Sequence, residues 1–362
     1  MKFIILKENL KNALSAVERV VTENNNLPIL RNVLLKADSH IKVAATNLEI
    51  GVTCLTAGKI TENGSLTIPF APLYNIISGS DSERINIITD KNTLIIKTDN
   101  YEAKIQGVNE EEFPIIPKIE NNNHYFEIEG QVFKESIQQI ISAAQFSEIK
   151  PELSGVLFDF QVTALKLVAT DSFRLAEKII TKKTELEQSI IIPRFTVQEV
   201  VRIFGDKEGE VSLSISENQI FFFTTELEVV SRLIDGHYPD YKKVIPEKFL
   251  SKITVKRSEL EKGVRLASIF SSTIADIKIQ TEKEGLKILA KNTDKGEVSS
   301  TIKGNLKGAN FAVAVNFRYI LDGVKVMTAE NITLEFTGEG SPLILKVEDH
   351  KDFLYLIMPL RS

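Results

Sequence analysis

Residue types that perform covalent or metal chemistry are few and scattered in this 362-residue sequence. The four histidines, at positions 40, 124, 237 and 350, lie 84 or more residues apart. None of them has a second histidine, a cysteine or a carboxylate at the spacing of a familiar zinc motif. We therefore interpret them as surface or loop residues, and we expect no metal site, no cofactor and no catalytic constellation.

The remaining candidate motifs also favour structural roles. Cys54 follows an alternating apolar stretch, which predicts a buried side chain rather than a nucleophile. The segment TGEGSP (337–342) has two glycines of a dinucleotide loop but lacks the third and precedes no helix, so it predicts a hairpin turn. The sequence has neither a phosphate-binding loop nor a G-x-S-x-G motif. Two function classes stay open: a multidomain binding scaffold, and an enzyme whose site the sequence hides.

Composition and charge restrict the scaffold further. The single cysteine excludes an internal disulfide framework, and no apolar run reaches the roughly 18 residues of a membrane span. The opening MKFIILKENL has too short an apolar run for a signal peptide, so we expect a soluble, cytoplasmic protein. The net charge of −5 argues against a protein that holds nucleic acid mainly by releasing counterions.

The chain repeats itself three times. Alternating strands ending in turn residues recur as IKVAATNLEI from 41, LKLVATDSFRLA from 165 and LKILAKNTDKGEV from 286. Pro69 and Pro193 lie 124 residues apart, and Pro193 and Asn316 lie 123 apart. This period is too long for a solenoid and indicates triplicated domains. We place them at 1–120, 121–250 and 251–362, with boundaries near 119–125 and 246–252.

Each repeat predicts the same order of elements. A strand followed by an amphipathic helix opens each one, and in the first helix Leu10, Ala13, Leu14 and Val17 share the i, i+3, i+4, i+7 spacing of a buried face. Two strands of period two close each repeat. The expected class is α+β, with two helices, about eight strands and antiparallel sheets per domain, because the connections are short. Triplication favours the binding scaffold, since an enzyme needs one unsymmetrical site.

Five motifs together resemble a known family across the whole chain. They are NLPIL (26–30), VATDSFRLA (168–176), DGHYPDYKKVIP (235–246), VNFRYILD (315–322) and the terminal MPLRS. Their order and spacing are similar to those of the bacterial DNA polymerase III beta subunit, the DNA sliding clamp. The resemblance implies the DNA-clamp fold and a head-to-tail homodimer that closes into a ring around duplex DNA. The alternative is a non-catalytic interaction scaffold that does not encircle DNA.

A ring would explain how an acidic chain keeps DNA, because a threaded duplex is held by topology. Only the lining of the ring then needs a mild positive charge. A protein that binds DNA without encircling it depends instead on strong contacts with the phosphates. The expected DNA-facing residues lie on the helix segments: Lys11, Arg19, Arg194, Arg202, Arg265 and Lys325. Asn24, Asn25 and Asn26 stand where the family often has a basic contact, and the segment 71–78 lacks basic residues.

The resemblance also implies a groove that takes short peptides from partner proteins. Its expected residues are Lys150, Leu153, Thr170, Ser172, Phe173, Arg174, Leu175, Pro239, Lys243, Val244, Asn316, Tyr319, Leu356, Ile357, Met358, Pro359, Leu360 and Arg361. Leu, Val, Pro and Met side chains make an adaptable apolar trough. Arg174 and Arg361 are expected to fix polar groups of the peptide at the rim.

The same resemblance implies the partners and the dimer contact. Partners are a second copy, double-stranded DNA without sequence preference, the polymerase III catalytic subunit, the clamp loader, and repair polymerases or ligase. The chain itself is expected to be a processivity factor and not an enzyme. The expected dimer contact joins an edge strand in 101–108 to the segment 297–304, with the interface residues Tyr101, Ala103, Ile105, Ile269 and Phe270.

Overall fold

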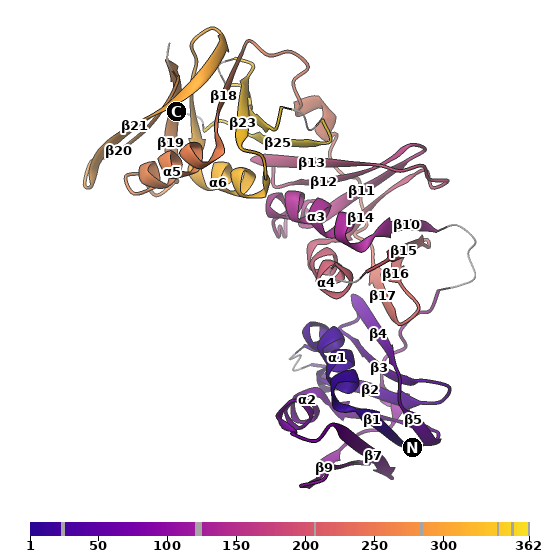
Figure 1. Ribbon diagram of the computed structural model, residues 1–362. Coiled ribbons are helices and arrows are strands. Elements are labelled where there is room, and N and C mark those ends of the chain that lie inside the picture. Colours follow the sequence, from indigo (N-terminus) through magenta and orange to yellow (C-terminus); the bar gives the residue numbers. More distant parts are fainter. Residues whose placement is uncertain are drawn as a thin grey trace. The chain divides into compact units, whose positions relative to one another are not determined.

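The computed structural model describes residues 1–22, 26–119, 125–205, 208–282, 285–338, 340–348 and 351–360. The chain forms two compact units (Figure 1). Unit 1 comprises 1–131 and 199–233, and unit 2 comprises 132–198 and 234–362. Each unit is described by itself.

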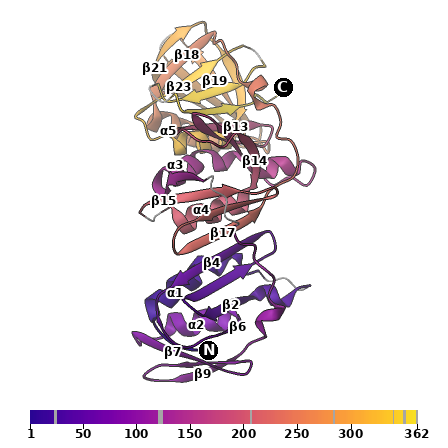
Figure 2. The ribbon, with the colours of Figure 1, turned by 90° about the vertical axis from the view of Figure 1, so that its right-hand side faces the viewer.

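The described part of unit 1 contains two antiparallel sheets. The smaller sheet has five strands, in the order β5 (Lys59–Glu62), β1 (Lys2–Leu6), β7 (Arg84–Asp90), β8 (Thr93–Lys97) and β9 (Glu102–Gln106). The larger sheet has eight, in the order β10 (Phe126–Glu129), β15 (Glu210–Ile215), β16 (Gln219–Phe223), β17 (Leu227–Arg232), β4 (Ile50–Thr56), β3 (Ile41–Thr46), β2 (Asn32–Ala37) and β6 (Gly64–Pro69). Strand β17 of the second repeat thus pairs with β4 of the first repeat (Figure 2).

The described part of unit 2 contains one antiparallel arrangement of twelve strands. Their order is β14 (Gln188–Pro193), β11 (Gly155–Gln161), β12 (Ala164–Thr170), β13 (Arg174–Thr181), β25 (Phe353–Ile357), β24 (Leu343–Lys346), β23 (Asn331–Phe336), β18 (Ser251–Lys256), β21 (Gly296–Gly308), β20 (Gly285–Asn292), β19 (Asp276–Glu282) and β22 (Ala312–Asn316). Strand β25 of the third repeat pairs with β13 of the second (Figure 1). Sheets therefore run across both boundaries between repeats.

Two α-helices belong to each repeat in the described chain. They are α1 (Lys7–Val17), α2 (Phe70–Gly79), α3 (Gly130–Ile140), α4 (Arg194–Phe204), α5 (Arg257–Ser268) and α6 (Phe317–Val326). Helix α1 packs on α2, β3 and β4 in unit 1, and α5 packs on α6, β20 and β21 in unit 2. The division between the units passes through α3 and α4. No described helix is long and apolar enough to cross a membrane.

Several sequence predictions are confirmed. The predicted face of α1 is buried at all four expected positions, Leu10, Ala13, Leu14 and Val17. Cys54 is buried, and the antiparallel strands β23 and β24 are consecutive along the chain, with the amide of Ser341 donating to the carbonyl of Gly338 between them. The fold class of three α+β repeats with antiparallel sheets is confirmed as well.

The predicted domain limits stay predictions. Of the first expected boundary, 119–125, most lies outside the described residues, whereas the second, 246–252, leads into β18. The compact units divide the chain differently from the repeats, because the β4–β17 and β13–β25 ladders join strands of successive repeats.

Candidate functional site

The two ladders between repeats have the same register. In unit 1, Gly51 lies opposite Val230, and Cys54 lies opposite Leu227. In unit 2, Leu175 lies opposite Leu356, and Lys178 lies opposite Phe353. Adding 124 to the residue numbers of β4 and 126 to those of β17 gives every residue pair of the β13–β25 ladder. The junction between repeats is therefore one structural motif used twice.

An identical turn leads into each ladder. Asn47 accepts hydrogen bonds from the amides of Glu49 and Ile50 at 3.0 and 2.9 Å. Asp171 accepts from the amides of Phe173 and Arg174, both at 2.9 Å.

The second residue of each turn is left-handed. Its φ is 76° at Leu48 and 75° at Ser172. Short polar side chains that accept from the backbone stabilise such turns, so the backbone direction of the next two residues is fixed.

The segment after each ladder bonds back to the turn. The amide of Arg232 donates to the carbonyl of Glu49 at 2.9 Å, and the amide of Met358 donates to that of Phe173 at 2.8 Å. The amide of Leu360 then donates to the carbonyl of Ala314 on β22 at 2.8 Å. The segment 358–360 is thus held between the 171–174 turn and β22.

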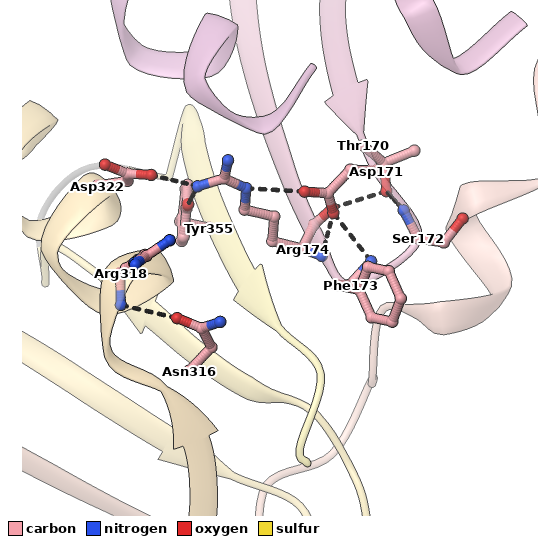
Figure 3. A network of polar contacts seen from close by, with 9 residues as sticks. All are labelled: Thr170, Asp171, Ser172, Phe173, Arg174, Asn316, Arg318, Asp322 and Tyr355. Atoms are coloured by element: carbon pink, nitrogen blue, oxygen red, sulfur yellow. Dashed lines mark hydrogen bonds and ion pairs between the residues drawn. The ribbon is translucent and has the colours of Figure 1, made fainter. Parts of the chain in front are cut away.

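Arg174 lies at the centre of a polar network within unit 2 (Figure 3). Its Nε donates to Asp171 at 3.1 Å, and its Nη1 is paired with Asp322 of α6. The guanidinium carbon lies 4.5 Å from the ring centre of Tyr319, within cation–π range. Burial opposes its charge, but these carboxylates and the Tyr355 hydroxyl nearby raise the pKa of Arg174. Only 11% of its side chain is exposed, so Arg174 links the turn to α6 rather than facing solvent.

Buried tyrosines surround this network. Burial raises the pKa of Tyr355 to about 12, in spite of the opposing effect of Arg174. Burial, followed by a 2.6 Å hydrogen bond to Glu177, also raises the pKa of Tyr241. Tyr238 donates to the carbonyl of Val168 at 3.4 Å, and its burial raises its pKa as well. Tyr238 and Tyr241 are neutral donors that fix the connecting segment 235–246 to the sheet.

An apolar cluster underlies the surface between β13, β25 and the connecting segment. Its buried members are Leu157, Val168, Leu175, Ile191, Tyr241, Ile344 and Leu356. Met358 packs against it while half-buried. Above the cluster, Phe173 is 60% exposed and Val244 43% exposed, and Leu360 is half-buried. Exposed apolar side chains on a rigid, buried base suit an adaptable binding surface.

The structure brings most of the predicted groove residues into one region of unit 2. Those on the 170–175 turn, on β25 with 358–360, and on α6 are joined by the contacts above: Thr170, Ser172, Phe173, Arg174, Leu175, Leu356, Ile357, Met358, Pro359, Leu360, Asn316 and Tyr319. Pro239, Lys243 and Val244 lie at η6 (Tyr241–Val244), whose Tyr241 is in the cluster. Lys150 and Leu153 lie at η5 (Pro151–Ser154), beside Gly236 of the connecting segment. Arg361 lies outside the described residues.

The predicted DNA-facing residues lie on or next to helices. Lys11 is half-buried on α1, and Lys325 is exposed in the last turn of α6. Arg265 is exposed and pairs with Glu261 at 2.7 Å. Arg194 begins α4, and its buried Nε has no partner among the described atoms.

Arg19 and Arg202 both bind the buried carboxylate of Glu199. Arg202 contacts it at 2.7 Å and also donates to the carbonyls of Ser15 and Ala16 at the end of α1, both at 2.9 Å. Arg19 contacts it at 3.5 Å while remaining largely exposed. Arg202 is thus a link between α4 and α1, and its DNA-facing role stays a prediction.

The predicted dimer residues lie in the first and the third repeat. Ile269 is 58% exposed, and Phe270 lies next to Gly296 at the start of β21. On β9, Ala103 is half-buried, whereas the Ile105 side chain is buried and leaves only its backbone available. Tyr101 donates its hydroxyl to the carbonyl of Ile76 on α2 at 3.1 Å.

Family models cover the chain in three consecutive parts. The N-terminal domain of the DNA polymerase III beta subunit matches residues 1–117, the central domain 127–240 and the C-terminal domain 242–361. The chain belongs to the DNA polymerase III beta subunit family. Each family model overlaps one of the three repeats, with limits that differ by up to ten residues.

Relatives of this beta subunit family align over the whole chain. The beta sliding clamp of Staphylococcus epidermidis is 26% identical over 377 residues and covers 100% of both chains. The solved sliding clamp of Bacillus subtilis is 25% identical with a TM-score of 0.95, covering 100% of this chain and 99% of that one. The DNA polymerase III subunit beta of Pseudomonas aeruginosa is also 25% identical, with a TM-score of 0.95 and full coverage of both chains.

Sequence reasoning missed the residues that organise the beta subunit's second ladder. Asp171, Asp322 and Tyr355 all contact Arg174, yet none was singled out. The sequence does contain one signal for Asp322. It lies six residues after Asn316, and Glu199 lies six residues after the equivalent Pro193, so the two repeats carry a carboxylate at the same position. Within the described residues, no cluster of three metal-ligating side chains occurs.

Proposed function

We propose that this chain is a DNA sliding clamp. Two copies join head to tail, encircle duplex DNA and tether a polymerase through a peptide-binding groove. It acts as a processivity factor rather than as an enzyme. The observation that carries the proposal is the repeated junction: the same ladder joins the first repeat to the second and the second to the third.

A third use of this ladder would close the assembly. Strand β9 pairs with β8 in the register in which β17 pairs with β16. Adding 126 to both residue numbers of each β8–β9 pair gives a β16–β17 pair. Strand β21 pairs with β20 as β13 pairs with β12, with Glu297 in the place of Leu175. Within the described chain, β9 has one ladder, and residues 296–303 of β21 pair only with β20. In the described chain, β9 and residues 296–303 of β21 therefore each lack the second neighbouring strand that their counterparts β17 and β13 have.

The register of that third ladder follows from the other two. In the two internal ladders, Leu175 lies opposite Leu356, and Gly51 lies opposite Val230. Glu297 is equivalent to Leu175, and Lys104 is equivalent to Val230, so Glu297 would lie opposite Lys104 of a second copy. Oppositely charged residues directly across a ladder stabilise it by roughly 0.2–1 kcal/mol. The contact is heterologous and each copy offers one edge of each kind, so in the proposed dimer both β9 edges and both β21 edges are paired.

The groove would bind partner peptides on the apolar surface around Phe173, Val244, Met358 and Leu360. Burying two large apolar side chains of a peptide contributes roughly 3–6 kcal/mol before ordering costs. Moderate affinity of this kind suits exchange among the polymerase catalytic subunit, the clamp loader and repair polymerases or ligase. Arg174 pairs with Asp171 of the turn and with Asp322 of α6, and so holds these two elements of the proposed groove together.

Encirclement accounts for the acidic net charge of −5. A threaded duplex needs only weak, sequence-independent contacts, which Lys11, Arg19, Arg265 and Lys325 would supply. A clamp that works on chromosomal DNA would act in the cytoplasm.

Release on cutting the DNA tests the proposal. The protein is loaded with its clamp loader and ATP on nicked circular plasmid, isolated by gel filtration, and treated with a single-cutting restriction enzyme. Retention on circles followed by loss on linear DNA is expected. Equal retention on both forms would indicate ordinary DNA binding, and failure to be retained on circles would favour a scaffold that does not encircle DNA.

A further inference from the structure

A cavity of about 220 Å³ lies against the β4–β17 ladder of unit 1. Its lining includes four residues of neighbouring strands, each directly opposite the next: Leu34 of β2, Ala44 of β3, Thr53 of β4 and Glu228 of β17. We call these four residues the first-junction row. The segment 110–118, which follows β9, supplies most of the remaining lining.

The second junction has an equivalent row of four residues. They are Leu157 of β11, Val168 of β12, Glu177 of β13 and Leu354 of β25, and each again lies opposite the next. Leu157 and Val168 belong to the apolar cluster together with Tyr241 of the connecting segment. The hydroxyl of Tyr241 donates to the carboxylate of Glu177 at 2.6 Å. The carboxylate of this row therefore has a phenol of the same chain as its donor.

The segment 110–118 of the first junction carries no phenol. Phe113, which a proline follows, stands in the place of Tyr238, which a proline also follows. Three positions further on, Ile116 stands in the place of Tyr241. A Cβ on Gly51 of the β4–β17 ladder would lie 2.9 Å from the Ile116 side chain, so Ile116 lies against the sheet but has no hydroxyl to donate.

The carboxylate of the first-junction row is left without a donor. Glu228 lines the cavity and accepts no hydrogen bond from the part of the chain that the structure describes. Burial raises the pKa of Glu228, although Lys42 and Lys118, which also line the cavity, oppose this shift. Buried polar groups in proteins are almost always hydrogen-bonded, so a half-buried carboxylate without a donor indicates a place for the donor of a ligand.

The size and the charges of the cavity specify the chemistry of that ligand. An apolar cavity of about 150 Å³ takes a benzene ring, so a cavity of about 220 Å³ has room for a phenol. Ala44 and Phe113 would give the ring apolar contacts. Lys42 and Lys118 repel a cationic donor, which favours a neutral hydroxyl.

We propose that this cavity binds a tyrosine side chain of a partner protein, whose hydroxyl donates to Glu228. The bound ring supplies at the first junction the phenol that Tyr241 supplies at the second. Pro117 and Lys118 of the lining are exposed, so a side chain can enter while its own backbone stays outside. The site is separate from the proposed peptide groove, which lies in unit 2, and it goes beyond the clamp proposal because it does not require a closed ring.

Two blocked amino acids that differ only in the hydroxyl test the proposal. N-acetyl-tyrosinamide and N-acetyl-phenylalaninamide are titrated into the full chain and followed by calorimetry. The tyrosine derivative should bind at least about fivefold more tightly, because the phenylalanine derivative leaves the carboxylate without a donor. Equal dissociation constants, or no binding of either probe, would overturn the proposal.

Two substitutions locate the bound probe, and circular dichroism verifies that each variant is folded. Glu228→Leu introduces the residue of the second row and should make the two probes bind alike. Glu226→Leu is the matched control, because Glu226 is exposed and lies outside the lining, so it should keep the preference for tyrosine. A preference that survives Glu228→Leu would contradict the assignment.

Filling the cavity gives an independent measurement. Ala44→Val introduces the side chain that the second row carries at Val168, and it should weaken binding of both probes at least about tenfold. Unchanged binding would show that the probes occupy another surface, and it would overturn the proposal.

A peptide separates a protein partner from a free phenol. A glycine–serine peptide with one central tyrosine should bind at least as tightly as N-acetyl-tyrosinamide, and its phenylalanine counterpart should bind more weakly. Binding of p-cresol without binding of the tyrosine peptide would overturn the assignment to a partner protein.

Discussion

At the β4–β17 ladder the carboxylate of Glu199 is 2% exposed and is held by Arg202 and Arg19. At the β13–β25 ladder its counterpart Asp322 is 41% exposed and is held by Arg174. The backbone of the two junctions is the same, from the turn through the ladder to the segment that follows. The difference lies in side chains: the first junction buries its carboxylate, whereas the second carries the exposed apolar residues where we propose the peptide groove.

The side chains that flank the ladders differ in polarity. The first turn presents Glu49, and the segment after its ladder begins with Arg232, both exposed. At the same two positions the second junction has Phe173 and Met358. The preserved backbone therefore carries apolar side chains at the proposed groove where the first junction has charged ones.

The largest expected difference between the junctions concerns Glu199. Glu199→Gln leaves Arg202 and Arg19 without their carboxylate in a buried site, and it should lower the free energy of unfolding of unit 1 by about 3 kcal/mol. Urea denaturation followed by circular dichroism measures this loss. A loss below about 1 kcal/mol would show that the ion pair does not hold the first junction.

Tyr355 makes the second junction sensitive to alkali. Its pKa is raised from 10.0 to about 12 because the neutral phenol is buried. The raised pKa stabilises the folded chain fully below pH 10, and this contribution of about 3 kcal/mol is lost as the pH rises through about 12.

Denaturation at a series of alkaline pH values, followed by phenolate absorbance, measures this loss. Tyr355→Phe should flatten the decline in that range. An unchanged slope in the variant would remove Tyr355 as its cause.

Phe173 should account for much of the groove's affinity. Phe173→Ala removes an exposed apolar side chain, so it should weaken binding of a fluorescent peptide from the polymerase catalytic subunit about tenfold, with little change in stability. Ile115→Ala is the matched control, because Ile115 is also exposed and apolar but lies in unit 1. Equal effects of both variants in a fluorescence anisotropy titration would argue against the groove.

Asp322 should show the smallest effect on stability. Asp322→Asn removes a partly exposed charge, and Arg174 keeps Asp171, so the loss of unfolding free energy should be about 1 kcal/mol or less. Comparison with Glu199→Gln under the same conditions tests whether exposure sets the difference. Similar losses at both positions would contradict the distinction between the junctions.

Local features of this chain could be predicted from the sequence, and long-range pairings could not. The buried face of α1, the 337–342 turn and the threefold repeat follow from spacing and turn residues, and the structure confirms them. The Arg174–Asp322 pair joins residues 148 apart, and its geometry depends on the β13–β25 register. The sequence does not show that Arg174 binds Asp171 and Asp322, because these pairs form only once the sheet is assembled, and the contact of Arg174 with a peptide stays a prediction.

The most direct test of the clamp is covalent closure at the proposed third ladder. In a Cys54→Ala background, Lys104→Cys and Glu297→Cys are combined and joined with a short bis-maleimide linker after loading on circular plasmid. The proposed register predicts cross-linked dimers that stay on the plasmid in detergent and leave when the plasmid is linearised. Monomers after cross-linking, or cross-linked dimers that leave circular DNA in detergent, would contradict encirclement through this junction.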